Sequence, residues 1–242
     1  MPPSQISDSL PLRYRLLLFL ALIAAGLAGN YYNYPIFLNI DFLFGSIFAM
    51  LALQFLGLRW GIAAACIIAG YTYLLWNHPY AVIIMTVEVA FVGLLMGRRK
   101  TGMVLADTLY WLIIGMPLAY LFYYVVMDVP LSNTYIVMTK QAVNGITNAL
   151  IARLVFTGFA LWSRSSLISL SDIIYNMLAF FVLFPALIML AISSRTDFKA
   201  TDSSIRTEIV HAGQGAVDYL EIWLANRRTS IANLAELAVS KS

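Results

Sequence analysis

The sequence predicts an all-α fold: a polytopic membrane helix bundle of about seven transmembrane helices, followed by a long extracytoplasmic C-terminal helix. Of the 242 residues, 61% are hydrophobic and 11% are charged, whereas soluble domains average about 45–50% apolar and about 25% charged residues. Apolar stretches close to the ~20 residues of a membrane-spanning helix recur along the chain. Lysine and arginine gather in alternate connections between these stretches. Together the observations exclude a water-soluble globular enzyme.

Seven apolar stretches are the expected spans, and they cover residues 16–28, 42–58, 61–76, 81–97, 103–127, 135–162 and 173–192. The first has two interpretations, a retained helix or a cleaved signal peptide, because a basic start precedes a short apolar core. We favour the retained helix, since membrane spans follow it. Pro117 predicts a kink in the fifth span, and the long, more polar sixth span is expected to tilt.

Basic residues set the expected orientation. They lie in connections that we place in the cytoplasm: Arg13, Arg15, Arg59, Arg98, Arg99, Lys100 and Arg164. The opposite connections, 30–41, 77–80 and 128–134, contain neither lysine nor arginine. By the positive-inside rule, the N-terminus is cytoplasmic and everything after Ser193 is extracytoplasmic. We therefore expect a multi-pass protein of the inner (plasma) membrane, with the lipid bilayer as its first partner.

The chain is expected to divide into a transmembrane bundle, 1–193, and an extracytoplasmic amphipathic helix, 194–242. Asp202, with the two serines after it, offers an N-cap. Apolar residues then recur at helical spacing: Ile205, Ile209, Ala212, Ala216, Tyr219 and Trp223. A helix with one apolar side needs a partner to bury that side, so pairing with a second copy is one expectation.

Other functional classes leave no signal in the chain. The net charge of +3 comes from scattered basic residues, so no nucleic-acid partner is predicted. Cys66 is the single cysteine, and the two histidines, His78 and His211, lie far apart in the sequence. Phosphate-binding loops, dinucleotide fingerprints, zinc-protease motifs and nucleophile elbows are missing. We therefore predict no catalytic residue, metal site or cofactor.

Ionisable residues inside the spans are the best candidates for function, because charges in lipid are costly and face the bundle interior. Glu88 lies roughly 10 Å below the outer end of the fourth span, and Lys140 lies about 8 Å below that of the sixth. The matched depths predict a Glu88–Lys140 pair. By the same estimate of depth along the spans, Asp107 and Arg153 lie near the cytoplasmic face of the membrane and form a second candidate ion pair.

A polar stripe continues along the sixth span from Lys140. Asn144 and Asn148 follow at steps of four residues, and Gln141 borders them. Such a stripe serves a small ligand, an ion path or a hydrogen-bonded seam between helices. Three interpretations stay open: a ligand or ion site, purely structural contacts, and a Lys140 side chain that snorkels outward.

Three segments, 39–46 (NIDFLFGS), 61–65 (GIAAA) and 75–80 (LWNHPY), resemble the N-terminal multi-helix membrane sensor modules of prokaryotic signalling proteins. Such modules precede sensor histidine kinases of two-component systems and diguanylate cyclases. Residues 219–235 (YLEIWLANRRTSIANLA) are similar to the long first helix of double Cache domains, which bind ligands outside the cell. The Cache sheets, the return span and all cytoplasmic output motifs are missing from this sequence. The resemblance implies a piece of a longer receptor or a stand-alone remnant.

The leading functional expectation is a sensory module that binds an unknown small ligand and relays a signal to an effector. Any kinase or cyclase activity would belong to a part outside this sequence. The alternative is a small transporter, or a binding component like those of vitamin uptake, with Lys140, Asn144 and Asn148 at a midplane site. An intramembrane enzyme lacks an acid–base or nucleophile constellation.

Overall fold

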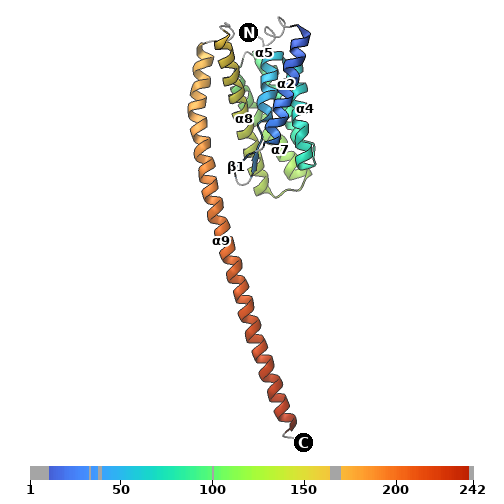
Figure 1. Cartoon of the computed structure of the whole chain (residues 1–242), viewed down its shortest axis with the longest axis vertical. Helices are drawn as coiled ribbons and strands as arrows, with labels where there is room; N and C mark the ends of the chain where they lie inside the picture. The colour runs from blue at the N-terminus through green and yellow to red at the C-terminus, as the bar shows by residue number, and fades with distance from the viewer. Residues whose placement is uncertain (1–10, 33, 38–39, 100, 164–169, 240–242) are drawn as a thin grey trace. The chain divides into compact units, whose positions relative to one another are not determined.

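The computed structural model describes residues 11–32, 34–37, 40–99, 101–163 and 170–239 (Figure 1). Its elements follow in the order α2 (Leu12–Tyr31), β1 (Tyr34–Phe37), β2 (Ile40–Phe42), α3 (Gly45–Leu56), α4 (Leu58–Trp76), α5 (Tyr80–Arg99), α6 (Met103–Tyr110), η1 (Trp111–Gly115), α7 (Met116–Tyr120), η2 (Leu121–Val126), α8 (Leu131–Trp162) and α9 (Leu170–Val239). The chain divides into two compact units, Met1–Ala191 and Ile192–Ser242.

The expected helical fold is confirmed, with one small addition. Five of the described helical segments are long and apolar enough to cross a membrane: Leu12–Tyr31, Leu58–Trp76, Tyr80–Arg99, Met103–Val126 and Leu131–Trp162. The addition is a short antiparallel pair of β1 and β2, in which Tyr34 lies opposite Phe42. Apart from Pro35 and Asp41, its residues are aromatic or β-branched, a composition typical of a short edge hairpin.

Helix α3 corrects the predicted second span. The expected helix covered residues 42–58, but α3 has only twelve residues, Gly45–Leu56, which is about 18 Å of helix. Nearly all of these residues are buried, with Met50 and Leu53 fully enclosed. Such burial is typical of a helix in the interior of a bundle, and α3 is shorter than the membrane-length helices. It ends at Gly57, whose φ of 93° allows the abrupt turn into α4.

The predicted fifth span is irregular around Pro117. Two α-helical pieces, α6 and α7, alternate with two π-helical pieces, η1 and η2. Proline lacks a backbone N–H and clashes with the carbonyl four residues earlier, which disturbs the α-helical pattern. Just before it, the N–H of Met116 bonds the carbonyl of Trp111, five residues earlier. The segment around the expected kink contains π-helical turns, which are a cause of helix kinks and are frequent at functional sites.

Helix α9 corrects the expected start of the C-terminal helix. It runs without interruption for 70 residues from Leu170 to Val239 and has Pro185 inside it. Asp202 therefore does not cap a new helix. The described apolar part of α9, Ile173–Val182, is shorter than a span. Apolar residues of its expected amphipathic part are exposed in the single chain, including Ile209, Tyr219 and Trp223.

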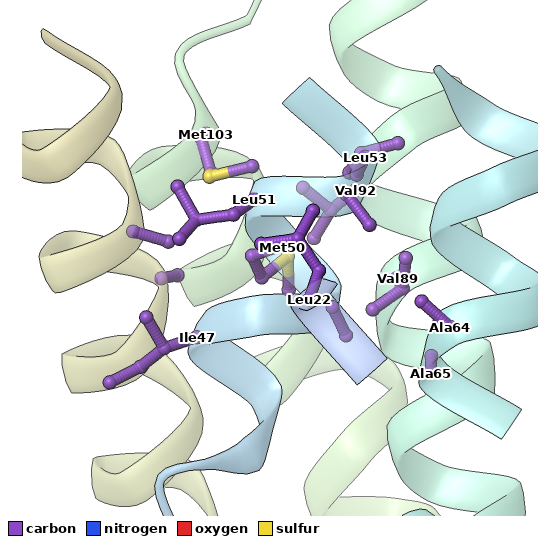
Figure 2. Packing of buried hydrophobic residues seen from close by; sticks show 14 of the residues in the cluster. Leu22, Ile47, Met50, Leu51, Leu53, Ala64, Ala65, Val89, Val92 and Met103 are labelled. Atoms are coloured by element: carbon purple, nitrogen blue, oxygen red, sulfur yellow. The ribbon is translucent and has the colours of Figure 1, made fainter. Parts of the chain in front are cut away.

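The hydrophobic core surrounds α3. Figure 2 shows Met50 and Leu53 of α3 among the side chains of neighbouring helices. Small residues of α4, Ala64 and Ala65, allow this helix to approach closely. Buried Asn30 ties the end of α2 to the same bundle: its Oδ1 accepts the N–H of Gly45 at 2.8 Å, and its Nδ2 donates to the carbonyl of Ile68 at 3.0 Å.

Candidate functional site

A cavity with both polar and apolar walls lies between α3, α4, α5, η1 and α8. Its walls are formed by Leu43, Ser46, Trp76, Ala81, Met85, Glu88, Trp111, Lys140, Gln141, Asn144 and Gly145. The centres of water-sized molecules can occupy about 30 Å³ of it, and roughly 10–15 Å³ of such space holds one water. The cavity therefore accommodates a few water molecules, an ion or a small polar group.

Glu88 of α5 carries a buried carboxyl group in the cavity wall, with 1% of the residue exposed. The indole Nε1 of Trp111 donates a hydrogen bond to its Oε1 at 3.0 Å. The carboxyl group of Asp107, also fully buried, is a close electrostatic neighbour of Glu88. Within the described part of the chain, neither oxygen of Asp107 accepts a hydrogen bond from an N–H or hydroxyl donor. Two acidic groups therefore meet in an apolar interior.

Gly145 of α8 makes this arrangement possible. A Cβ atom at this position would overlap Nε1 of Trp111 and lie 2.6 Å from Oε1 of Glu88. Only a residue without a side chain lets the backbone of α8 pass so close to both groups. The glycine therefore sets the spacing of α8 from α5 and η1 at the cavity.

Two amide side chains of α8 present unsatisfied oxygens at the cavity. Oδ1 of Asn144 and Oε1 of Gln141 are buried and have no hydrogen-bond partner among the described residues. Asn144 is 8% exposed, whereas Gln141 is half-buried and donates from Nε2 to the hydroxyl of Tyr123 at 3.1 Å. Buried polar atoms without a protein partner are costly, and a cavity beside them indicates a place for water or a ligand.

Lys140 contributes a positive charge to the same wall. The residue is half-buried, and its Nζ lies 5.6 Å from the ring centroid of Trp76, within the range of a cation–π interaction. The cavity therefore combines acidic, basic and amide groups with two indole rings. Among the described residues no cluster of three or more histidine, cysteine or acidic residues could hold a metal ion.

Beyond the cavity, toward the C-terminal end of α8, side-chain hydrogen bonds join α8 to α3, and we call these contacts the seam. Nδ2 of Asn148 donates to the carbonyl of Leu43 at 2.7 Å and to Oγ of Ser46 at 2.6 Å. Farther along, a guanidinium nitrogen of Arg153 donates to Oε1 of Gln54 at 3.2 Å. These contacts give polar side chains a purely structural use, as expected of helix–helix hydrogen bonds.

The structure brings most of the predicted site residues together. Glu88, Lys140, Gln141 and Asn144 line one cavity, while Asn148 lies one turn beyond Asn144 and belongs to the seam. Their role as a ligand or ion site stays a prediction, as does the Glu88–Lys140 pair. The structure gives Glu88 contacts with Trp111 and Asp107.

Asp107 and Arg153 stay a candidate ion pair. Within the described part of the chain, both oxygens of Asp107 lack a hydrogen-bond donor, whereas Arg153 donates to Oε1 of Gln54. The structure therefore gives Arg153 a contact with α3, and it gives Asp107 a neighbour on α5, Glu88. Depth along a helix does not determine which neighbour a side chain faces.

Among the wall residues that sequence reasoning missed are two tryptophans and a serine. Trp76 and Trp111 supply its aromatic surface, and Ser46 supplies a hydroxyl group. The spacing of Asp107 and Trp111 by four residues was an available signal, because such residues share a helix face. No sequence signal indicates that this face meets Glu88.

A chain of side chains connects the cavity to the turn between α4 and α5. The ring of His78 stacks on Tyr80 at 5.2 Å and meets the ring of Tyr123 edge-on at 5.6 Å. Tyr123 in turn accepts the hydrogen bond from Gln141. Burial lowers the pKa of His78 from its usual 6.5, because the charged imidazolium loses hydration. His78 is therefore neutral at pH 7.

Comparison with models of known protein families, with characterised proteins and with solved structures finds no match for this chain. The fold and the cavity consequently carry the functional argument.

Proposed function

We propose that the chain is an integral membrane sensory module whose helical bundle binds a small polar ligand in the cavity between α5 and α8. The observation that carries the proposal is the convergence of Glu88, Lys140 and Asn144 on one cavity inside a bundle of apolar helices. Ionisable residues within membrane helices mark ligand or ion sites by default. The room in the cavity fits a ligand of few atoms.

The expected orientation belongs to the same proposal. It places the N-terminus in the cytoplasm and the C-terminal part of α9 outside the inner (plasma) membrane, as the basic connections require. The exposed apolar residues of α9 support a partner for this helix, and a second copy of the chain is the partner we propose. In a longer receptor, a Cache-type domain and an output kinase or cyclase would complete the signal path.

Orientation is tested by labelling with an impermeant thiol reagent after Cys66 is replaced by alanine. Cysteines at Ser132 and Ser203, which are both exposed, should react in intact cells. A cysteine at Ser165, which lies outside the described residues, should react only after lysis. The opposite pattern would overturn the orientation.

Ligand binding is tested by filling the cavity. Met85→Trp adds bulk to its wall, and Ile83→Trp adds the same bulk on the exposed face of α5, where Ile83 is 41% exposed. Thermal unfolding of the chain in nanodiscs is recorded with ammonium chloride, sodium chloride, glycine and urea as probes. A ligand at 100 times its Kd stabilises the folded state by about 2.7 kcal/mol. We expect at least one probe to raise Tm in the native chain and in Ile83→Trp but not in Met85→Trp. Equal shifts in all three proteins, or none, would contradict the proposal.

A transporter is the second candidate function, and α3 is the observation that favours it. This short helix follows the non-helical segment at residues 43–44, and Leu43 and Ser46 line the cavity. Broken helices beside a central site are typical of secondary transporters. Uptake of a stabilising probe into proteoliposomes would favour transport, and binding without uptake would favour the sensor.

A further inference from the structure

The contact between Glu88 and Asp107 has a consequence for protonation. Their residues are 1% and 0% exposed, and the two carboxyl groups are electrostatic neighbours. Trp111, four residues after Asp107 on the same helix face, donates to Glu88, and both oxygens of Asp107 lack a hydrogen-bond partner among the described residues. Two neighbouring carboxylates cannot hydrogen-bond each other without a proton, and their negative charges repel strongly in an apolar interior. A single proton removes the repulsion and supplies the donor that Asp107 otherwise lacks. The pair is therefore built to hold one proton.

Water can reach this pair through the cavity. Glu88 forms part of the cavity wall, and the space suits a few water molecules. The second, independent observation is Asn144, whose buried Oδ1 lies at the same cavity and has no hydrogen-bond donor among the residues that the structure describes. A water that donates to this oxygen and contacts Glu88 would satisfy both groups.

The other groups around the pair fit this protonation state. Lys140 of α8 contributes one positive charge at the cavity, equal and opposite to the charge of a singly protonated pair. Tyr110 donates its hydroxyl proton to the carbonyl of Ile84 at 2.6 Å. Tyr123 accepts from Gln141, and the guanidinium of Arg153 donates to Gln54.

We propose that the Glu88–Asp107 pair is a proton-binding site that exchanges its proton with water in the cavity. On release, the carboxylic O–H bond breaks, its electron pair stays on the carboxylate, and the proton forms hydronium with a cavity water. Protonation reverses these changes. The inference rests on the proposed binding role of the cavity and makes the proton one of its ligands.

The test is infrared spectroscopy of the full chain in nanodiscs, which distinguishes carboxylic acid from carboxylate by the C=O stretch. At neutral pH we expect one buried carboxylic acid per chain in the native protein, and its band should disappear at alkaline pH. Glu88→Gln and Asp107→Asn should each abolish or shift the band. Glu208→Gln, the same change at an exposed position of α9, should leave it unaltered. In D₂O the native band should shift promptly, and Asn144→Leu should slow this shift without removing the band.

Absence of the acid band from the native protein at neutral pH would overturn the proposal, even if both variants failed to fold. A band that persists unchanged in both variants would overturn it as well. An unchanged exchange rate in Asn144→Leu would overturn the water route through the cavity. Each of these results leaves the probe-binding test with Met85→Trp unaffected, so failure of the proton site and failure of the ligand-binding proposal are distinguishable.

Discussion

The indole Nε1 of Trp111 donates a hydrogen bond to Oε1 of Glu88 at 3.0 Å. This bond joins η1 to α5 and fixes the direction in which the carboxyl group meets the cavity. Because Trp111 is 2% exposed, water does not replace the donor readily. The position of Glu88, and with it the chemistry of the cavity, therefore depends on a side chain from the irregular segment around Pro117.

Trp111→Phe should destabilise the fold. The change removes the indole donor and leaves a buried carboxyl group with one partner fewer, which costs about 1–3 kcal/mol. Equilibrium unfolding in detergent measures the loss. Trp162→Phe is the matched control, since Trp162 is 84% exposed. Equal losses in both variants would contradict the role assigned to the bond.

Gly145→Ala should also destabilise the chain, because the added methyl group overlaps Trp111 and crowds Glu88. Overpacking of this kind costs about 1–3 kcal/mol. Gly158→Ala makes the same change on α8 at a position with no atom within 4 Å, and it should be neutral or stabilise by up to about 1 kcal/mol. The comparison uses the unfolding assay described for Trp111. Equal tolerance of Gly145→Ala and Gly158→Ala would contradict the close approach of α8 to Trp111 and Glu88.

Stability should fall at acidic pH through His78. Its folded-state pKa lies below 6.5, so the unfolded chain binds the proton more tightly. His78 therefore contributes fully to the free energy of unfolding above pH 6.5. This contribution is lost as the pH falls through the lower pKa of the folded state. His78→Phe keeps an aromatic ring beside Tyr80 but cannot ionise. Thermal unfolding between pH 8 and pH 5 should therefore show a smaller loss in the variant, and identical profiles would refute the assignment.

Much of this architecture was predictable from hydropathy and charge. The long helices from Leu58 to Arg99 follow directly from apolar runs, and the polar stripe of α8 follows from residues spaced by one turn. The failures have physical causes. Hydropathy cannot distinguish a buried interior helix such as α3 from a lipid-facing span, because both are apolar. An N-cap sequence such as that at Asp202 permits a helix to begin but does not require it.

The candidate site was predictable only in part. Burial of charge is costly enough to single out Glu88 and Lys140 from sequence alone. The partners of these residues depend on helix rotation and on the π-helical turns before Pro117, and neither is encoded in a depth count. For this reason Trp111 and the contact with Asp107 emerge only from the three-dimensional structure.

A double-mutant cycle tests the predicted coupling of Glu88 and Lys140. A fully buried pair would lose about 3–5 kcal/mol when one partner is removed. Lys140 is half-buried beside a cavity, so we expect a coupling of about 1 kcal/mol or less. Glu88→Gln and Lys140→Met are compared with the double variant, which should recover part of the loss. Losses that add within about 0.3–0.5 kcal/mol would rule the pair out.

The central claim is that the polar stripe of α8 divides between Asn144, which serves the cavity, and Asn148, which holds α3. Unfolding free energies of Asn144→Leu and Asn148→Leu test it most directly, since both residues are buried on one helix, one turn apart. Asn148→Leu removes two hydrogen bonds and should cost about 1–3 kcal/mol. Asn144→Leu removes no hydrogen bond to a described residue and should leave stability unchanged or raised. Equal destabilisation by the two changes would contradict the account and assign the whole stripe to helix packing.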